Sequence, residues 1–148
     1  MAEDRAAIVM ESFPGRDPRF PLVRAVRQAV FIEEQDCPPE EEWDDKDEVS
    51  RHLAAYLDGD VVGTLRWYDD EGWLHIGRVA VLGRARGMGI ATALMRRCLE
   101  EGRRQGFTRA FLNAQYDKTG LYAAFGFIAV GEEFMEAGIR HIRMELFF

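Results

Sequence analysis

The stretch VAVLGRARGMGIATAL, residues 79–94, joins an apolar run to a loop with two close glycines and then to a segment of helical periodicity. A strand that enters such a loop at the start of a helix leaves backbone N–H groups unpaired beside the positive end of the helix dipole. This arrangement binds phosphate, because glycine lets the backbone approach an anion closely. Arg84 and Arg86 can add charged donors at its rim. The alternative is an ordinary strand-to-helix turn.

Two nucleotide-binding motifs do not fit this loop. A P-loop ends in Gly-Lys-Ser or Gly-Lys-Thr, whereas Gly89 is followed by Ile90 and Ala91. A dinucleotide-binding loop has a third glycine where Thr92 stands, and an acidic residue about 20 positions later that FTRAFL does not supply. If the loop binds phosphate, the protein belongs to neither of these two nucleotide-binding classes.

Length, composition and charge limit the possible classes further. The 148 residues suffice for one domain with a substantial core, and we expect residues 1–148 to form a single domain. The net charge of −7 disfavours nucleic acid as a partner. The chain has no apolar run long enough for a membrane span and no signal-peptide pattern, so a cytoplasmic protein is expected. The two cysteines lack metal-ligand spacing, which predicts free thiols and no metal site.

The periodicity predicts the order β-α-β-β-β-α-β-α-β-β, hence an α+β fold with a mixed sheet of about six to seven strands and helices on both faces. In the first helix, the apolar stripe consists of Leu22, Val26, Ala29 and Val30. Residues 35–48 are expected to be a loop, because two prolines interrupt them and their carboxylates repel one another. The expected strands are residues 6–12, 52–58, 61–69, 72–82, 108–115, 126–134 and 139–148, and the expected helices are residues 19–34, 87–105 and 117–125.

These features together resemble the GNAT superfamily of acyl-CoA-dependent N-acyltransferases. Its central signature, Gln or Arg-x-x-Gly-x-Gly or Ala after a Val-Ala-Val strand, is matched by RGMGIA at 86–91 after VAV at 79–81. Its second signature, Tyr a short spacer before Gly-Phe, is matched by Tyr122 and residues 126–127. The order of elements is similar over the whole chain. More narrowly, the chain resembles the ElaA-like branch of this superfamily in four segments, VFIEEQDCP, GRVAVL, LNAQ and EAGIRHIRM.

The resemblance implies a GNAT fold in which two splayed strands, here within RVAV and FLNAQ, hold the pantetheine arm of acetyl-CoA. It implies no metal, and it implies that Tyr122 is the general acid that protonates the departing thiolate. Gln115 stands where many relatives have asparagine, and its side-chain amide offers the same groups. The implied coenzyme contacts are Val79, Ala80, Val81, Arg84, Arg86, Gly87, Met88, Gly89, Ile90, Ala91, Thr92, Asn113, Gln115 and Tyr122.

A catalytic base is also needed, because an alkylamine is mostly protonated at neutral pH. His75 is one candidate: strand alternation places it on the same face as Val79, and a carboxylate occupies its place in some relatives. The alternative for His75 is a packing role. Glu33 and Glu34 end the first helix, where substrate-binding loops lie in relatives, and either could deprotonate an amine or be merely solvated. His141 is expected to be structural or to line the substrate site.

The expected activity is transfer of an acetyl group from acetyl-CoA to the primary amine of a small molecule or peptide, by direct attack and without a covalent enzyme intermediate. The acidic segment 40–48 favours a cationic acceptor, for example a polyamine or an aminoglycoside-like amine. A homodimer is compatible with the resemblance. Two alternatives stay open: a non-catalytic acyl-CoA-binding module, and an interaction protein whose acidic segment docks a basic partner.

Overall fold

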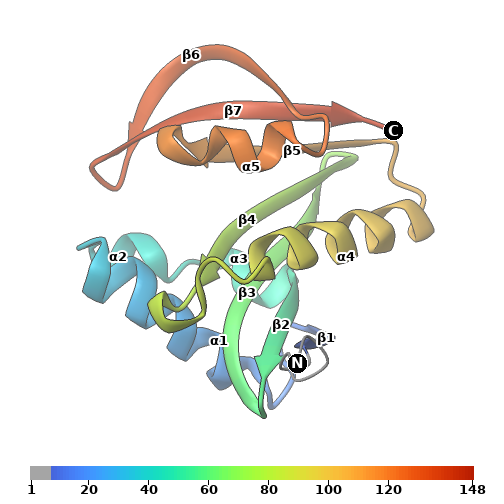
Figure 1. The fold of residues 1–148 in the computed structure, drawn as a ribbon. Helices are drawn as coiled ribbons and strands as arrows, with labels where there is room; N and C mark the ends of the chain where they lie inside the picture. Colours follow the sequence, from blue (N-terminus) through green and yellow to red (C-terminus); the bar gives the residue numbers. More distant parts are fainter. Residues whose placement is uncertain (1–7) are drawn as a thin grey trace.

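A computed structural model describes residues 8–148, and this part of the chain contains a seven-stranded mixed sheet (Figure 1). The strand order is β1-β2-β3-β4-β5-β7-β6, and all neighbours are antiparallel except the parallel pair β4 and β5. The expected strands are therefore confirmed. Residues 6 and 7 of the first expected strand, and most of the segment on which the signal-peptide expectation rests, lie outside the described residues. The strands are β1 Ile8–Pro14, β2 Arg51–Leu57, β3 Asp60–Asp70, β4 Trp73–Val81, β5 Arg109–Gln115, β6 Ile128–Glu136 and β7 Ile139–Phe147.

The helices also occur at the expected places. The first expected helix is divided into α1 (Phe20–Arg27) and a π-helical continuation, η2 (Gln28–Glu34). Within residues 8–148, no helix is both long and apolar enough to cross a membrane. The remaining helices along the chain are η3 Gly83–Ala85, α4 Ile90–Arg104, η4 Tyr116–Lys118 and α5 Thr119–Ala123.

Two expectations about the first third of the chain were wrong. Leu22 does not belong to the buried stripe of α1, because the helix is rotated so that Val23 packs with Phe13 and Ala54. The segment 35–48 is not all loop, since it holds the short helices α2 (Pro39–Glu42) and α3 (Lys46–Val49). The carboxylates of this segment do not simply repel one another, because arginines from other elements pair with them.

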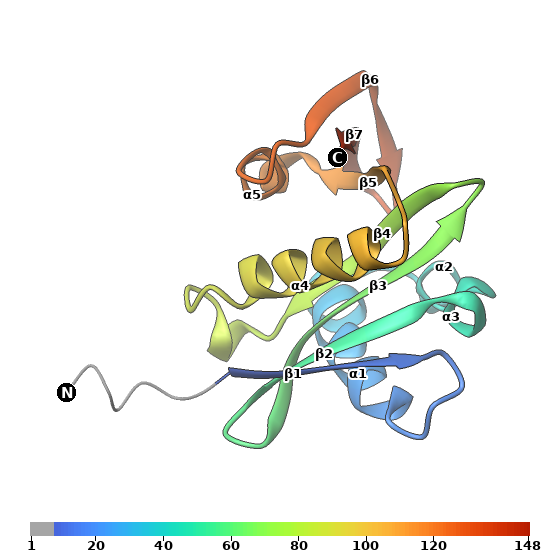
Figure 2. The same cartoon turned by 90° about the vertical axis from the view of Figure 1, so that its right-hand side faces the viewer.

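Helix α1 with its continuation η2 covers one face of the sheet, and α4 covers the opposite face (Figure 2). Successive side chains of a strand point to opposite faces. In β2, Leu53 and Ala55 pack in the main core with Leu94 of α4, whereas Ala54 between them packs with Val23 of α1. The prediction of helices on both faces is therefore confirmed.

The parallel strands β4 and β5 stay together only at their start. Residues 74–76 lie opposite residues 110–112, and beyond them the two strands separate (Figure 1). Strand β4 also has a bulge, because its register with β3 shifts between Thr64 and Arg66, and Arg78 has a φ of 54°. Such a φ is uncommon for a residue other than glycine. The alternation of side chains along β4 therefore changes phase at Arg78.

Candidate active site

A cavity of about 1050 Å³ opens where β4 separates from β5. Its walls come from η2, the segment after it, β3, β4, the loop before α4 and the start of that helix, the end of β5, η4, α5 and the β6–β7 hairpin. Its size is at the upper end of the range for small-molecule sites. The glycine loop and Tyr122, far apart in the sequence, thus border one cavity.

The glycine loop forms one end of this cavity. Gly87 and Gly89 have φ values of 79° and 78°, a conformation that side-chain-bearing residues adopt only with strain. A Cβ on either glycine would meet no atom within 4 Å, so the space around the loop is open. Gly89 caps α4 without a side-chain hydrogen bond. The first N–H groups of the helix are therefore free to bind an anion.

Most of the implied coenzyme contacts lie around the cavity, but two do not. Arg84 lies outside it, with Nη2 at 3.6 Å from the carboxylate of Asp60. Met88 is 44% exposed and also lies outside the lining. The residues that do line the cavity are Val79, Ala80, Val81, Arg86, Gly87, Gly89, Ile90, Ala91, Thr92, Asn113, Gln115 and Tyr122.

Two side-chain contacts bridge η2, or the turn just after it, to other walls of the cavity. Arg86 donates from Nη2 to Glu34 Oε1 at 2.8 Å and from Nε to the carbonyl of Val81 at 3.0 Å. Gln115 Nε2 donates to Gln35 Oε1 at 2.9 Å. Since the side chains of Arg86 and Glu34 are about half exposed, their ion pair adds little stability and leaves Arg86 able to change partner.

Tyr122 lies in α5 and is buried in the main core while also lining the cavity. Its ring packs edge-on against Phe127 with 6.3 Å between ring centroids. Burial raises the pKa of the Tyr122 phenol from 10.0 to about 12. The phenol is therefore fully protonated at neutral pH and has a proton to donate.

His75 also lines the cavity, but the expectation that it shares a face with Val79 was wrong. The bulge at Arg78 reverses the alternation between the two positions. Val79 consequently packs against the α4 side of the sheet with Ile76, whereas His75 packs on Phe111 and Tyr68, with ring centroids 4.0 Å and 4.7 Å away.

The remaining base candidates differ in position. Glu33 is exposed and lies outside the cavity lining, so the geometry does not support it as a base. Its neighbour Glu34 lines the cavity but is engaged by Arg86. His141 lines the cavity with Nδ1 at 2.7 Å from the carbonyl of Ile139, in agreement with the expected structural or lining role.

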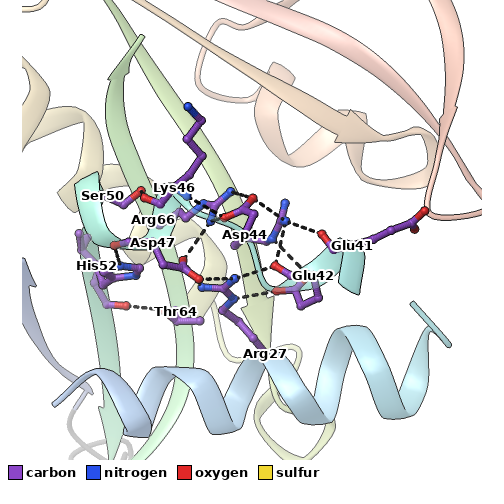
Figure 3. Close-up of polar contacts among 12 residues, drawn as sticks. Arg27, Glu41, Glu42, Asp44, Lys46, Asp47, Ser50, His52, Thr64 and Arg66 are labelled. Carbon is purple, nitrogen blue, oxygen red and sulfur yellow. Dashed lines mark hydrogen bonds and ion pairs between the residues drawn. The ribbon is translucent and has the colours of Figure 1, made fainter. Parts of the chain in front are cut away.

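Three carboxylates of the acidic segment, those of Glu42, Asp44 and Asp47, are bound to arginines from other elements (Figure 3). Arg27, whose side chain is only 1% exposed, donates from Nε to Glu42 at 2.7 Å and from Nη1 to Asp47 at 2.6 Å. Arg66 donates from Nη1 to Asp44 at 2.7 Å and to Asp47 at 2.9 Å. These bonds connect α1, β3 and the segment between η2 and β2.

Arg78 completes this network at the cavity wall. Its Nη2 donates to the backbone carbonyls of Glu41 and Glu42 at 3.2 Å and 3.1 Å, and to Asp44 Oδ2 at 3.2 Å. Three guanidinium groups thus balance the three carboxylates of Glu42, Asp44 and Asp47. The argument for a cationic acceptor from the acidic composition of residues 40–48 therefore loses most of its basis, although Glu41 and Asp45 still line the cavity.

The sequence reasoning missed the side chains that surround His75. Asp70 Oδ2 lies 3.1 Å from His75 Nδ1, and Tyr68 is the cross-strand partner of His75. The sequence DDEG held a usable signal, because a two-residue turn at 71–72 would have placed all three side chains on one face. Arg78 had no such signal, since its partners are more than 30 residues away.

Both cysteines, Cys37 and Cys98, are free and buried. Among residues 8–148, no group of three or more His, Cys, Asp or Glu side chains is arranged to hold a metal ion.

A family model, curated relatives and solved structures all match this chain. A model of the acetyltransferase (GNAT) domain matches residues 25–148. The N-acetyltransferase YjcF of Bacillus subtilis is 36% identical over 121 residues, which cover 80% of this chain and 86% of YjcF. Protein ElaA of Escherichia coli is 35% identical over 124 residues, covering 80% of this chain and 81% of ElaA. The crystal structure of an acyl-CoA N-acyltransferase from Pseudomonas aeruginosa is 34% identical, covers 94% of this chain and 99% of its own, and superposes with a TM-score of 0.86.

Proposed function

The chain belongs to the GNAT acetyltransferase family, in the branch that includes ElaA, and from this premise we propose that it transfers an acetyl group from acetyl-CoA to a primary amine. The acceptor is the amine of a small molecule or peptide. Although the family match begins at residue 25, β1 precedes it and pairs with β2 in the same sheet. We therefore propose that the whole chain forms one acetyltransferase domain.

One observation carries this proposal: the N-terminus of α4, which is suited to bind an anion, and the gap between β4 and β5 border the same cavity. Backbone N–H groups of residues 87–92 and the guanidinium of Arg86 are suited to the pyrophosphate of coenzyme A. Beyond Ile76, β4 has no pairing with β5, so its backbone groups on that side can bind the amides of the pantetheine arm. Asn113 and Gln115 line the opposite wall.

Tyr122 is suited to act as the general acid. In the transfer, a C–N bond forms to the acetyl carbon and the C–S bond to coenzyme A breaks. The departing sulfur takes a proton from the Tyr122 phenol, and the phenolate recovers one from the acetylated nitrogen through solvent. Because burial raises the pKa of Tyr122 to about 12, the phenol holds its proton until the thiolate forms.

His75 is the base that we propose for the acceptor amine. An alkylammonium must lose a proton before its nitrogen can attack. Burial lowers the pKa of His75, which keeps its imidazole neutral and able to accept that proton at neutral pH. His75 lies at the point where β4 and β5 separate, on the face opposite the α4 and α5 core.

Calorimetric titration with acetyl-CoA, beside ATP and NAD, tests the coenzyme site first. We expect saturable binding of acetyl-CoA and none of the two nucleotides, since the loop lacks their motifs. A panel of primary amines, assayed for release of the coenzyme thiol, then tests turnover. Because Glu42, Asp44 and Asp47 are paired with arginines, we expect these three carboxylates to add little to any preference for polycationic over neutral amines.

The outcomes of these assays distinguish the alternatives. Absence of acetyl-CoA binding would overturn the proposed function. Tight binding with no thiol release beyond hydrolysis, on any amine of the panel, would favour the non-catalytic acyl-CoA-binding module instead.

A further inference from the structure

Of the three histidines in the chain, His75 alone both lines the cavity and has a carboxylate partner at hydrogen-bonding distance on one ring nitrogen only. His52 is fully buried away from it, between Phe13 and Phe20, and Nε2 lies 3.0 Å from the carbonyl of Asp47. His141 has contacts at both nitrogens, with Ile139 and with Glu136. Among residues 8–148, we find no hydrogen-bond partner for His75 Nε2.

The contact with Asp70 determines which nitrogen of His75 carries the proton. An ionised carboxylate only accepts hydrogen bonds, so Nδ1 of the neutral imidazole must donate to Asp70 Oδ2 across the 3.1 Å contact. The lone pair is then on Nε2. The ring packs against Phe111 and Tyr68 at interplanar angles of 31° and 41°, which restricts its orientation, and the side chain of His75 is 19% exposed.

We propose that Asp70 is a positioning residue for the transfer reaction: it holds His75 in the Nδ1–H tautomer and leaves Nε2 as the atom that removes the proton from the acceptor amine. This inference rests on the proposed function and extends it to a residue at the end of β3. Asp70 itself touches neither substrate. It also stabilises the imidazolium that forms once the amine proton has moved to Nε2.

Some of the groups around His75 raise its pKa and others lower it. Burial lowers the pKa of His75, and the hydrogen bond and charge of Asp70 raise it. Arg66 in β3 and Arg143 in β7 lower it. From α3, Lys46 places Nζ over the Tyr68 ring, 5.7 Å from its centroid. Asp70 is therefore the carboxylate whose hydrogen bond and charge oppose the effects of burial and of the two arginines on the pKa of His75.

The variant Asp70→Asn tests the inference, because an amide can donate a hydrogen bond to Nδ1 and so move the proton to Nε2. We expect kcat for acetyl transfer to fall by roughly tenfold or more, part of the 10²–10⁴ that a general base contributes. The KM for acetyl-CoA should stay within about twofold, since Asp70 lies outside the cavity lining. Asp70→Glu should restore part of the rate. Asp69→Asn is the matched control, because Asp69 bonds the turn N–H of Gly72 and not His75.

Two readouts separate positioning from a merely structural role. Ring ¹⁵N spectra should show His75 as the Nδ1–H tautomer in the wild type and a shift toward Nε2–H in Asp70→Asn, with a lower His75 pKa. The acid limb of the kcat/KM profile should move to lower pH in the same variant. An active wild type whose rate, tautomer and pH profile are unchanged by Asp70→Asn would overturn this inference alone. A wild type without transfer activity would overturn the proposed function and the role of Asp70 with it.

Discussion

At the scale of single residues, Tyr122 offers the sharpest test of the proposed chemistry. Tyr122→Phe removes only the hydroxyl and keeps the ring in place against Phe127. If the phenol protonates the leaving thiolate, kcat should fall by about 10²-fold, while acetyl-CoA affinity and thermal stability change little. Steady-state kinetics with a good acceptor amine, together with a melting curve, measure both quantities.

Tyr116 provides the matched control for this substitution. It lies in the neighbouring η4, is 47% exposed, and carries Arg140 over its ring at 4.2 Å. Tyr116→Phe should therefore leave kcat unchanged. Equal kcat values in wild type and Tyr122→Phe would instead assign Tyr122 to packing, which is the usual role of a buried tyrosine.

Sequence reasoning reached Tyr122 and most loop residues, because these positions are marked by short local motifs. It placed His75 on the wrong face relative to Val79, and it could not tell that Glu33 lies outside the cavity lining, because neither position is fixed by a local motif. A bulge at Arg78 placed His75 on the opposite face from Val79. The orientation of η2 placed Glu34, and not Glu33, at the cavity.

At the scale of elements, the start of α4 is the part of the fold most directly tied to coenzyme binding. Gly89→Ala would force a Cβ into a φ of 78°, at a cost of about 1 kcal/mol or more in stability or a shift of the loop. Since the N–H groups of the loop must point together at an anion, we expect acetyl-CoA affinity to fall by at least about tenfold. Calorimetric titration of the variant measures this loss.

Gly59→Ala supplies a control with the same backbone strain. Gly59 has a φ of 86° in the β2–β3 turn, a Cβ there would meet nothing within 4 Å, and the turn is not part of the cavity. Both variants should lose similar thermal stability, but only Gly89→Ala should lose affinity. If acetyl-CoA binds both variants as it binds wild type, the loop is an ordinary turn.

The order and type of the longer elements could be predicted because each has its own hydrophobic period over seven residues or more. The short helices α2 and α3, four residues each, could not. Helices of this length are not stable by themselves. They form here because Arg27, Arg66 and Arg78, from three other elements, bind the carboxylates between them.

At the scale of the whole molecule, this arginine and carboxylate network joins one wall of the cavity to the sheet. It links α1, β3 and β4 to residues 42–47, which no strand pairing holds. Its charged residues are spread over more than 50 residues of sequence. The acidic residues are clustered in one segment and are seen in the composition of that segment, whereas the arginines that pair with them are distant in sequence and are not. Residues 42–47 are consequently a structural part of the cavity wall. Protonation of their carboxylates at low pH should weaken the ion pairs that hold them.

Asp44 allows that dependence on pH to be measured. Burial opposes its ionisation, but the hydrogen bonds and charge of Arg66 and the charge of Arg78 outweigh burial and lower the Asp44 pKa from 3.8 to about 2. The unfolded chain therefore binds more protons than the folded chain between these values, so the free energy of unfolding should fall as the pH drops from about 4 toward 2. In Asp44→Asn, this contribution to the slope of unfolding free energy against pH should disappear. Asp45→Asn, which changes the exposed residue next to Asp44, should retain it. Urea titrations of the three proteins from pH 7 to pH 2.5 compare the slopes, and equal slopes in all three would show that Arg66 does not stabilise the Asp44 carboxylate.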